Sequence, residues 1–215
     1  MSARAFSDHE ISLLDRHFTE RKNSRDRLLL LLGVSTGLRI HELLSITVAD
    51  LWKDGEVVHD LSIQRARLKG GRSLKRRAVR GRRIPLADNV REVAADHLAK
   101  IGMFESTRAV FGSRQSGVGA MTLFQAYRRL RQACRACGID LVGVSTHAYR
   151  KTYCQAFYNR TKDLLLTQVA MGHANPLTTA VYLRADQGRA DQIIRELATR
   201  LASPVPAPIG MVAAG

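Results

Sequence analysis

Five residues in three short segments of this chain have side chains that could together cleave a phosphodiester. Tyr182 lies nine residues after His173 in the stretch MGHANPLTTAVYLR. Upstream, Arg39 lies in TGLRIHELLSI, and His147 and Arg150 lie in STHAYRKTY. Each residue type alone is common, but a phenol, two imidazoles and two guanidinium groups fit a covalent attack on phosphorus. The set predicts DNA strand cleavage through a phosphotyrosine.

Each task in this chemistry has a candidate residue. A free tyrosine has a pKa of about 10, so Tyr182 needs a general base, and we assign that role to His147. The two arginines offer planar, bidentate hydrogen bonds to phosphate oxygens, a geometry that lysine cannot copy. Lys69, directly before Gly70 and Gly71, could protonate the leaving 5′-oxygen. His173 could donate a hydrogen bond to the same phosphate.

The charge of the chain also points to a polyanion. It has 34 basic and 19 acidic residues, a formal net charge of +15 at pH 7. No acidic residue lies between Asp60 and Asp88, and the cations crowded there are Arg65, Arg67, Lys69, Arg72, Lys75, Arg76, Arg77, Arg80, Arg82 and Arg83. Because unbalanced cations repel one another, we interpret the segment as DNA-binding. The alternative is a solvated hairpin with a flexible basic tip.

The elements that must position these residues are mainly helical. Ser7 and Glu10 form a capping-box pattern that predicts a first helix over 8–21. Ser24 can cap a second helix, whose LLLLLGV run indicates burial and which Gly37 ends, leaving Arg39 at a turn-to-helix junction. Over 56–86, alternating and β-branched residues around KGGRS predict two or three antiparallel strands. The expected fold class is therefore mainly α with a small antiparallel β-sheet.

Further helices are expected along the second half of the chain. Asp88 can cap the next one, and another is expected over 120–137. Ser145 or Thr146 can cap a helix that places His147 and Arg150 on nearly the same side, where they could share one ligand. A short helix should end near Gly172, and a last one should cover 188–201. The Pro-, Gly- and Ala-containing tail over 202–215 is expected to be disordered or a docking extension.

Other classes of site are disfavoured by the sequence. Cys134, Cys137 and Cys154 are too few for a disulfide framework, and the CxxC they include lacks further ligands for zinc, so we expect these thiols to pack. Neither a GxGxxG nor a GxxxxGK[ST] motif is present. The longest apolar run, at 28–34, is too short to span a bilayer, and no export signal is evident. We expect a cytoplasmic, nucleoid-associated protein without membrane contact.

The motifs resemble those of the tyrosine recombinase (phage-type integrase) family over about Ser7 to Ala198. TGLRIHELLSI is similar to the first arginine box, with Glu42 where an acidic residue usually supports the site. HAYRK is similar to the His-x-x-Arg box, and MGHANPLTTAVYLR to the segment that ends in the nucleophile. The resemblance implies a DNA breaking-rejoining catalytic-domain fold, a 3′-phosphotyrosine with a free 5′-hydroxyl, and no metal or nucleotide cofactor.

Two departures from the family pattern affect the interpretation. The catalytic domain is expected over 1–201, with no N-terminal core-binding domain, which suggests either a short single-domain recombinase or a catalytic fragment. The basic hairpin is longer than the compact type, so Lys75 competes with Lys69 for the role of general acid. We prefer Lys69 because it precedes the turn glycines.

The resemblance also implies partners. Four protomers would synapse two specific double-stranded DNA sites, with possible accessory DNA-bending proteins, and the outcome would be integration, excision or inversion. Apolar residues after Tyr182, namely Ile193, Ile194, Leu197 and Leu201, would contact a neighbouring protomer. The rivals are a type IB topoisomerase-like enzyme and a non-catalytic DNA-binding regulator on the same fold.

Overall fold

The computed structural model describes residues 3–67, 81–102, 106–113, 119–173, 176–180 and 191–197. The chain divides into two compact units, Met1–Leu183 and Arg184–Gly215. Within the described part of the second unit, 191–197 is helical, inside the expected range 188–201. The tail over 202–215 lies outside the described residues. Among the described residues, no helix is long and apolar enough to cross a membrane.

The first unit is mostly helical, as expected, with two small antiparallel sheets. Its helices are α1 (Asp8–Glu20), α2 (Ser24–Thr36), α3 (Ile40–Leu44), α4 (Val48–Leu51), α5 (Asp88–Ile101), α6 (Leu123–Ala136), α7 (His147–Thr161), α8 (Leu164–Met171) and α9 (Pro176–Ala180). Its strands are β1 (Trp52–Lys53), β2 (Glu56–Val57), β3 (Asp60–Ile63) and β4 (Arg82–Pro85). A short 3₁₀ turn, Arg65–Arg67, follows β3.

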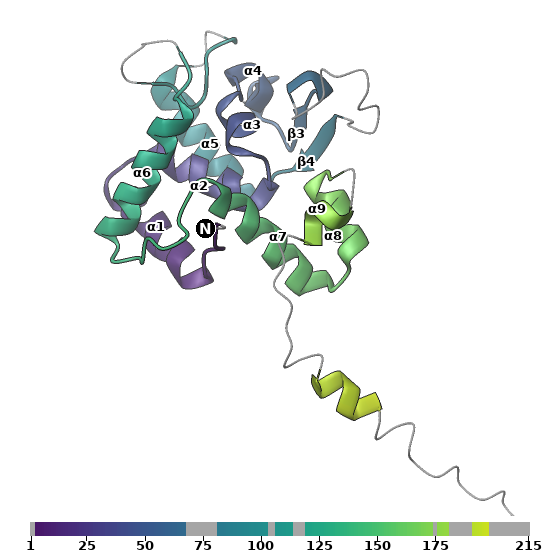
Figure 1. Ribbon diagram of the computed structural model, residues 1–215. Helices are drawn as coiled ribbons and strands as arrows, with labels where there is room; N and C mark the ends of the chain where they lie inside the picture. The colour runs from purple at the N-terminus through teal and green to yellow at the C-terminus, as the bar shows by residue number, and fades with distance from the viewer. Residues whose placement is uncertain are drawn as a thin grey trace, which may run out of the picture. The chain divides into compact units, whose positions relative to one another are not determined.

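Helix α2 forms the centre of the first unit. Leu28, Leu30 and Leu32 are fully buried, because α1, α5 and α7 all pack against this helix. Figure 1 shows α7 running from α2 toward the α8–α9 pair. The all-apolar stretch predicted to be central is therefore the scaffold of the fold, and its carboxyl-terminal end at Thr36 is held firmly in place.

The helix boundaries follow local capping chemistry, with two corrections to the expected caps. Ser7 and Glu10 form the expected capping box of α1. Asn23, not Ser24, caps α2, because its side-chain oxygen accepts a hydrogen bond from the backbone of Asp26. Similarly, α5 begins at Asp88, and Ala87 is its N-cap. In both cases the polar residue that we expected outside the helix is its first residue.

The strands form two separate pairs. Strand β2 lies at the start of the region predicted to form strands, whereas β1 and its pairing with β2 were missed, since each of these strands has only two residues. In the second pair, Ile63 lies opposite Arg82 and Ser62 opposite Arg83. Burial alternates along β4, where Ile84 is buried and Arg83 exposed. Adjacent arginines on β4 therefore face opposite sides of the sheet.

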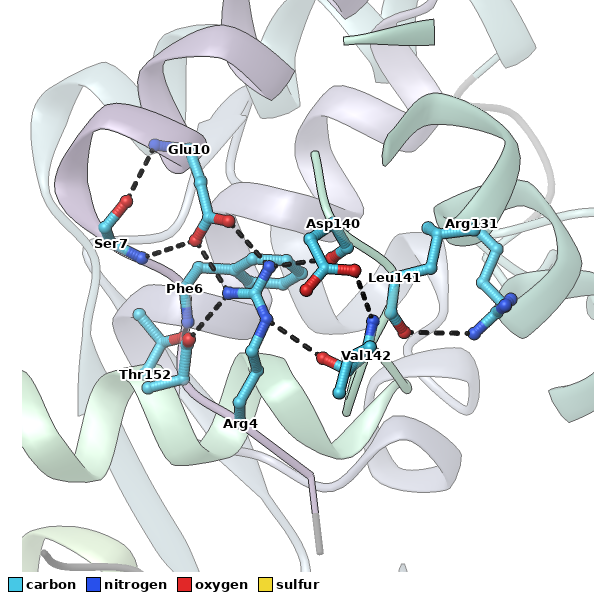
Figure 2. Close-up of polar contacts among 10 residues, drawn as sticks. Arg4, Phe6, Ser7, Glu10, Arg131, Asp140, Leu141, Val142 and Thr152 are labelled. Carbon is cyan, nitrogen blue, oxygen red and sulfur yellow. Dashed lines mark hydrogen bonds and ion pairs between the residues drawn. The ribbon is translucent and has the colours of Figure 1, made fainter. Parts of the chain in front are cut away.

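An N-terminal strap, Ala3–Phe6, fixes α7 against the rest of the unit. The Arg4 guanidinium donates to both carboxylate oxygens of Glu10, at 2.8 and 2.6 Å, and to the carbonyls of Asp140 and Val142 (Figure 2). The backbone N–H of Phe6 donates to Thr152 Oγ1 on α7 at 2.8 Å. These bonds join the start of the chain to the loop before α7 and to α7 itself.

Candidate active site

The candidate site is built where the carboxyl-terminal ends of α2 and α8 meet. Gly37 and Gly172 end these helices with φ values of +62° and +64°, a left-handed conformation that glycine adopts without strain. The last carbonyls of a helix have no partner within the helix and carry partial negative charge. Two arginines bind these carbonyls and link the two helix ends.

Arg150 is the first of these arginines. It is 1% exposed and lies one turn into α7. Its Nη1 donates to the carbonyl of Gly37, and its Nη2 donates to the carbonyl of Met171 at 2.9 Å. Nη2 also lies 2.7 Å from His173 Nε2. The residue predicted from the His-x-x-Arg pattern therefore joins the end of α2 to the end of α8.

Arg82 is the second of these arginines. The sequence interpretation placed it in a DNA-binding hairpin, whereas in the structure its guanidinium lies at the two helix ends. Its Nη2 donates to the carbonyls of Thr36, at 3.1 Å, and Ala170, at 2.6 Å. Burial lowers the pKa of its guanidinium, with a further lowering from Arg39, while Tyr153 and Glu42 act in the opposite direction. The carbonyls it binds immediately precede those bound by Arg150.

His173 lies against both helix ends. It is 7% exposed; its Nε2 faces Arg150, and its Nδ1 lies 2.8 Å from Thr179 Oγ1 on α9. Because a guanidinium can only donate, Nε2 must be the acceptor and Nδ1 carries the proton. Burial lowers the pKa of His173 to about 3, with further lowering by Arg150, Arg39 and Arg82. This histidine is neutral at physiological pH.

Arg39 and Glu42 occupy the start of α3, as expected. The Glu42 carboxylate is buried and accepts from the Arg39 backbone N–H at 2.7 Å and from Arg39 Nη1 at 3.2 Å. The Arg39 side chain is 25% exposed. A buried anion therefore anchors one side of the guanidinium while part of it faces solvent, which is suitable for binding an oxyanion.

His147 is the first residue of α7 and is exposed. Its backbone N–H lies 3.3 Å from Ser145 Oγ. Arg150, one turn later, is buried, so the two side chains differ in environment although they lie on one helix. The general-base role of His147 stays a prediction, and its exposure leaves it accessible to a large ligand.

Two cations of the basic segment are paired with carboxylates outside it. Arg67 Nη1 lies 2.7 Å from Asp50 Oδ2, and Arg83 Nη2 lies 2.7 Å from Asp60 Oδ2. The Arg67 side chain is largely buried, whereas that of Arg83 is 77% exposed. The sequence interpretation treated both charges as unbalanced, because it considered only the acids between Asp60 and Asp88. Their roles in DNA binding stay predictions.

Several predicted site residues lie outside the described residues. They include the proposed nucleophile, Tyr182, and both candidates for the general acid, Lys69 and Lys75. The same holds for the DNA-binding candidates Arg72, Arg76, Arg77 and Arg80 and for the side chain of Arg65. The residues brought together at the helix ends are Arg39, Glu42, Arg150 and His173, together with Arg82.

The three cysteines are free thiols, and Cys134 and Cys154 are buried. Burial raises the pKa of each of these two to about 11, as expected for thiols packed among apolar groups. No group of three or more metal-ligating side chains occurs in the part of the chain that the structure describes. Cys134 lies in the apolar core and Cys137 packs against it, as expected for the CxxC.

Residues 7–189 match the model of the phage integrase family. The chain belongs to the phage integrase family. The motif-based prediction of this family, and with it the tyrosine recombinase class of enzyme, is confirmed. The match begins at the capping residue of α1 and extends beyond Tyr182.

Named relatives of this phage integrase family member are recombinases. The "Probable integrase/recombinase YoeC" of Bacillus subtilis is 29% identical over 176 residues, which cover 80% of this chain and 84% of the relative. Tyrosine recombinase XerH of Campylobacter jejuni is 27% identical over 80% of this chain and 46% of its own length. The chain thus spans most of the first relative and about half of the second.

Solved structures of recombinases share the fold. A crystal structure of XerA recombinase superposes with a TM-score of 0.67 at 19% identity, covering 95% of this chain and 66% of that one. The XerH recombinase bound to its difH substrate, before cleavage, gives a TM-score of 0.66 at 20% identity, covering 88% and 53%. The predicted DNA breaking-rejoining catalytic-domain fold is confirmed.

Thr179 is a participant that sequence reasoning missed, and Arg82 makes bonds to the helix ends that sequence reasoning did not anticipate. Thr179 orients His173 from a segment already recognised as part of a motif, but nothing in its type or spacing marked it. Arg82 was assigned to the DNA-binding set on charge alone. The alternation along RRIPL contained a usable signal, because Arg82 shares the inward side of β4 with the buried Ile84.

Proposed function

We propose that this chain is the catalytic part of a site-specific DNA recombinase that acts through a 3′-phosphotyrosine. Arg39 and Arg150 would hold the scissile phosphate, Arg150 by exchanging a bond to a helix-end carbonyl for one to a phosphate oxygen. The Tyr182 oxygen would form a bond to phosphorus as the bond to the 5′-oxygen breaks. His147 would take the phenolic proton, and Lys69 or Lys75 would supply a proton to the 5′-oxygen. The freed 5′-hydroxyl of the partner strand would later reverse these steps.

The observation that carries this proposal is the convergence of Arg39, Arg150 and His173 at the ends of α2 and α8. Their motifs are far apart in the sequence, and both Arg150 and Arg39 lower the pKa of His173, so the three groups share one electrostatic environment. Positive charge preorganised by a buried carboxylate and backbone carbonyls favours the charge that develops on a phosphate under attack.

Double-stranded DNA at specific sites is the proposed substrate, and the nucleoid within the cytoplasm is the proposed location. Relatives of known structure were solved with DNA, including XerH with difH and a transposon integrase with transposon-end DNA. These neighbours support DNA as the partner and a role in a mobile element. Integration, excision and inversion are all compatible with one cleavage chemistry.

We further propose a homotetramer on two synapsed sites, with accessory DNA-bending proteins where the sites require them. Within the second unit, Ile193, Ile194 and Leu197 are 43%, 62% and 49% exposed. Apolar side chains exposed together on one helical segment favour burial against another protein surface. A second copy of the chain is the occupant that strand exchange requires.

The nucleophile can be tested with a pool of nicked duplexes of randomised sequence, in which loss of the short cleaved fragment traps the covalent intermediate. Wild type should give a denaturant-resistant protein–DNA adduct, and Tyr182→Phe should give none. Tyr158→Phe is the matched control, because it removes a phenolic hydroxyl at a partly exposed position outside the motif segments, and it should retain the adduct. An adduct with Tyr182→Phe would show that another group is the nucleophile.

A type IB topoisomerase would use the same covalent step, so its products distinguish it from a recombinase. The two duplexes recovered from the adduct carry different labels. A recombinase should yield strands that join DNA from both duplexes. A topoisomerase would reseal the parental strands and relax supercoiled DNA without choosing a site. A binding regulator would give neither product and no adduct.

A further inference from the structure

Arg82 and Arg83 are neighbours in sequence with opposite environments. Arg83 is 77% exposed and pairs with Asp60 on the adjacent strand β3. Arg82 points to the other side of β4, where its Nη2 reaches the carbonyls of Thr36 and Ala170. The second of these partners is 88 residues away in the chain. The strand alternation makes one arginine a surface cation and the other a bridge between helices.

Gly172 shows how closely the Arg82 side chain fits this place. A Cβ atom at Gly172 would lie 2.9 Å from Arg82 Cδ and 3.1 Å from its Nε. The methylene stem therefore lies directly on the turn that ends α8, one residue before His173. Glu42 raises and Arg39 lowers the pKa of Arg82, and Arg82 in turn lowers the pKa of His173. Arg82 is thus packed within the candidate site without facing solvent as Arg83 does.

We propose that Arg82 is a positioning residue that holds the ends of α2 and α8 together and so keeps Arg39 and His173 in place for the reaction. This inference rests on the proposed function. Arg150 binds the next carbonyl along each helix, Gly37 and Met171, so the two arginines form successive links across the same junction. Without Arg82, the carbonyls of Thr36 and Ala170 lose a charged donor, and the turns at Gly37 and Gly172 can move apart.

The test compares Arg82→Met with Arg91→Met. Arg91 also donates to a backbone carbonyl, that of Val57 at 3.0 Å, but it lies on α5 and outside the proposed catalytic and DNA-binding residues. Methionine retains an unbranched stem over Gly172 and removes the donors. With the trapping duplexes at saturating concentration, Arg82→Met should lower the single-turnover rate constant for adduct formation by about tenfold to a hundredfold, as expected for misplaced catalytic groups. Arg91→Met, which removes a carbonyl-binding guanidinium elsewhere in the unit, should leave this rate constant unchanged. Arg82→Lys, which keeps a charged donor, should recover part of the rate.

The rate constant and the amplitude of adduct formation together distinguish a positioning role of Arg82 from a purely structural one. A purely structural role would reduce the amplitude of the adduct burst, because fewer molecules are folded, and leave the rate constant of the remainder unchanged. A DNA-contact role would instead reduce the slope of log affinity against log salt by about 0.9 in Arg82→Met. Either result, with an unchanged rate constant, would overturn the positioning role while the wild-type adduct still supports the proposed function. Absence of the wild-type adduct would overturn both.

Discussion

His173 is held in one protonation state by its neighbours. Arg150 can only donate to Nε2, so the ring proton lies on Nδ1 and is directed at Thr179 Oγ1. A second proton on this ring would be placed against a buried guanidinium. The sequence suggested that His173 donates to a phosphate; in the structure its Nε2 is an acceptor for Arg150, so the donor role stays a prediction that requires this contact to rearrange.

The depressed pKa of His173 predicts loss of stability in acid. The folded-state pKa is about 3, whereas that of an unfolded histidine is about 6.5, so the unfolded chain binds a proton first as pH falls. This contribution is fully present above the unfolded value and is lost as pH falls toward the folded value. Between pH 7.5 and 5.0, wild type should lose about 2 kcal/mol more unfolding free energy than His173→Gln.

Urea unfolding at the two pH values measures this difference. The exposed His9 provides the control, and His9→Gln should follow the wild-type pH dependence. Buried His97, whose pKa is also lowered by burial, contributes equally to all three proteins. If His173→Gln and wild type lose the same free energy, His173 is not buried as a neutral group.

The turn that ends α2 shows how one element positions several groups. Gly37 adopts φ +62°, its carbonyl accepts from Arg150 Nη1, and the Tyr153 ring covers its Cα. An added Cβ would lie 2.3 Å from Tyr153 Cδ1, which no real contact allows. The end of α2, Arg150 and α7 therefore pack so closely that position 37 has no room for a side chain larger than hydrogen.

Gly37→Ala should accordingly be more destabilising than the same change at a left-handed glycine with open surroundings. Gly138 has φ +68° and nothing within 4 Å of an added Cβ, so Gly138→Ala should cost about 1 kcal/mol from backbone strain alone. Gly37→Ala should cost about 2 kcal/mol more, because overpacking is added to the same strain. Chemical unfolding compares the two variants, and equal costs would contradict the packing described at Tyr153.

Several of the cations behind the net charge of +15 have structural partners. Arg150 and Arg82 bind backbone carbonyls, and Arg67 pairs with Asp50. These charges support the site from within. The phosphate contacts that we propose are the six cations over 68–80, Lys69, Arg72, Lys75, Arg76, Arg77 and Arg80.

Salt dependence of DNA binding tests this division. Replacing Arg76 and Arg77 by glutamine should reduce the slope of log affinity against log salt by about 1.8, since each neutralised phosphate contributes about 0.9. Arg16 and Arg21 are exposed on and just after α1, so the double variant Arg16→Gln, Arg21→Gln removes the same charge elsewhere. Its slope should match wild type; equal reductions would indicate a diffuse field in place of a basic DNA-binding segment.

Much of the fold and part of the site were determined by local sequence. The Ser7–Glu10 box, the glycines at 37 and 172 and the apolar LLLLLGV run predicted helix ends and burial correctly, because capping, left-handed turns and an all-round apolar helix surface involve residues close in the chain. The spacing of Arg39, His147, Arg150, His173 and Tyr182 was sufficient to predict the family, since each motif lies on one short element.

The partners of each charged side chain depend on contacts between elements that are distant in the sequence. Arg82 and Arg83 are identical in type and adjacent, yet one pairs on the surface and the other joins two helices, because its partner Ala170 is distant in sequence and is brought near by folding. The same holds for Arg67 with Asp50 and for His173 with Arg150. Residue type specifies which bonds a side chain can make, whereas the packing of α2, α7 and α8 determines which partners lie within reach.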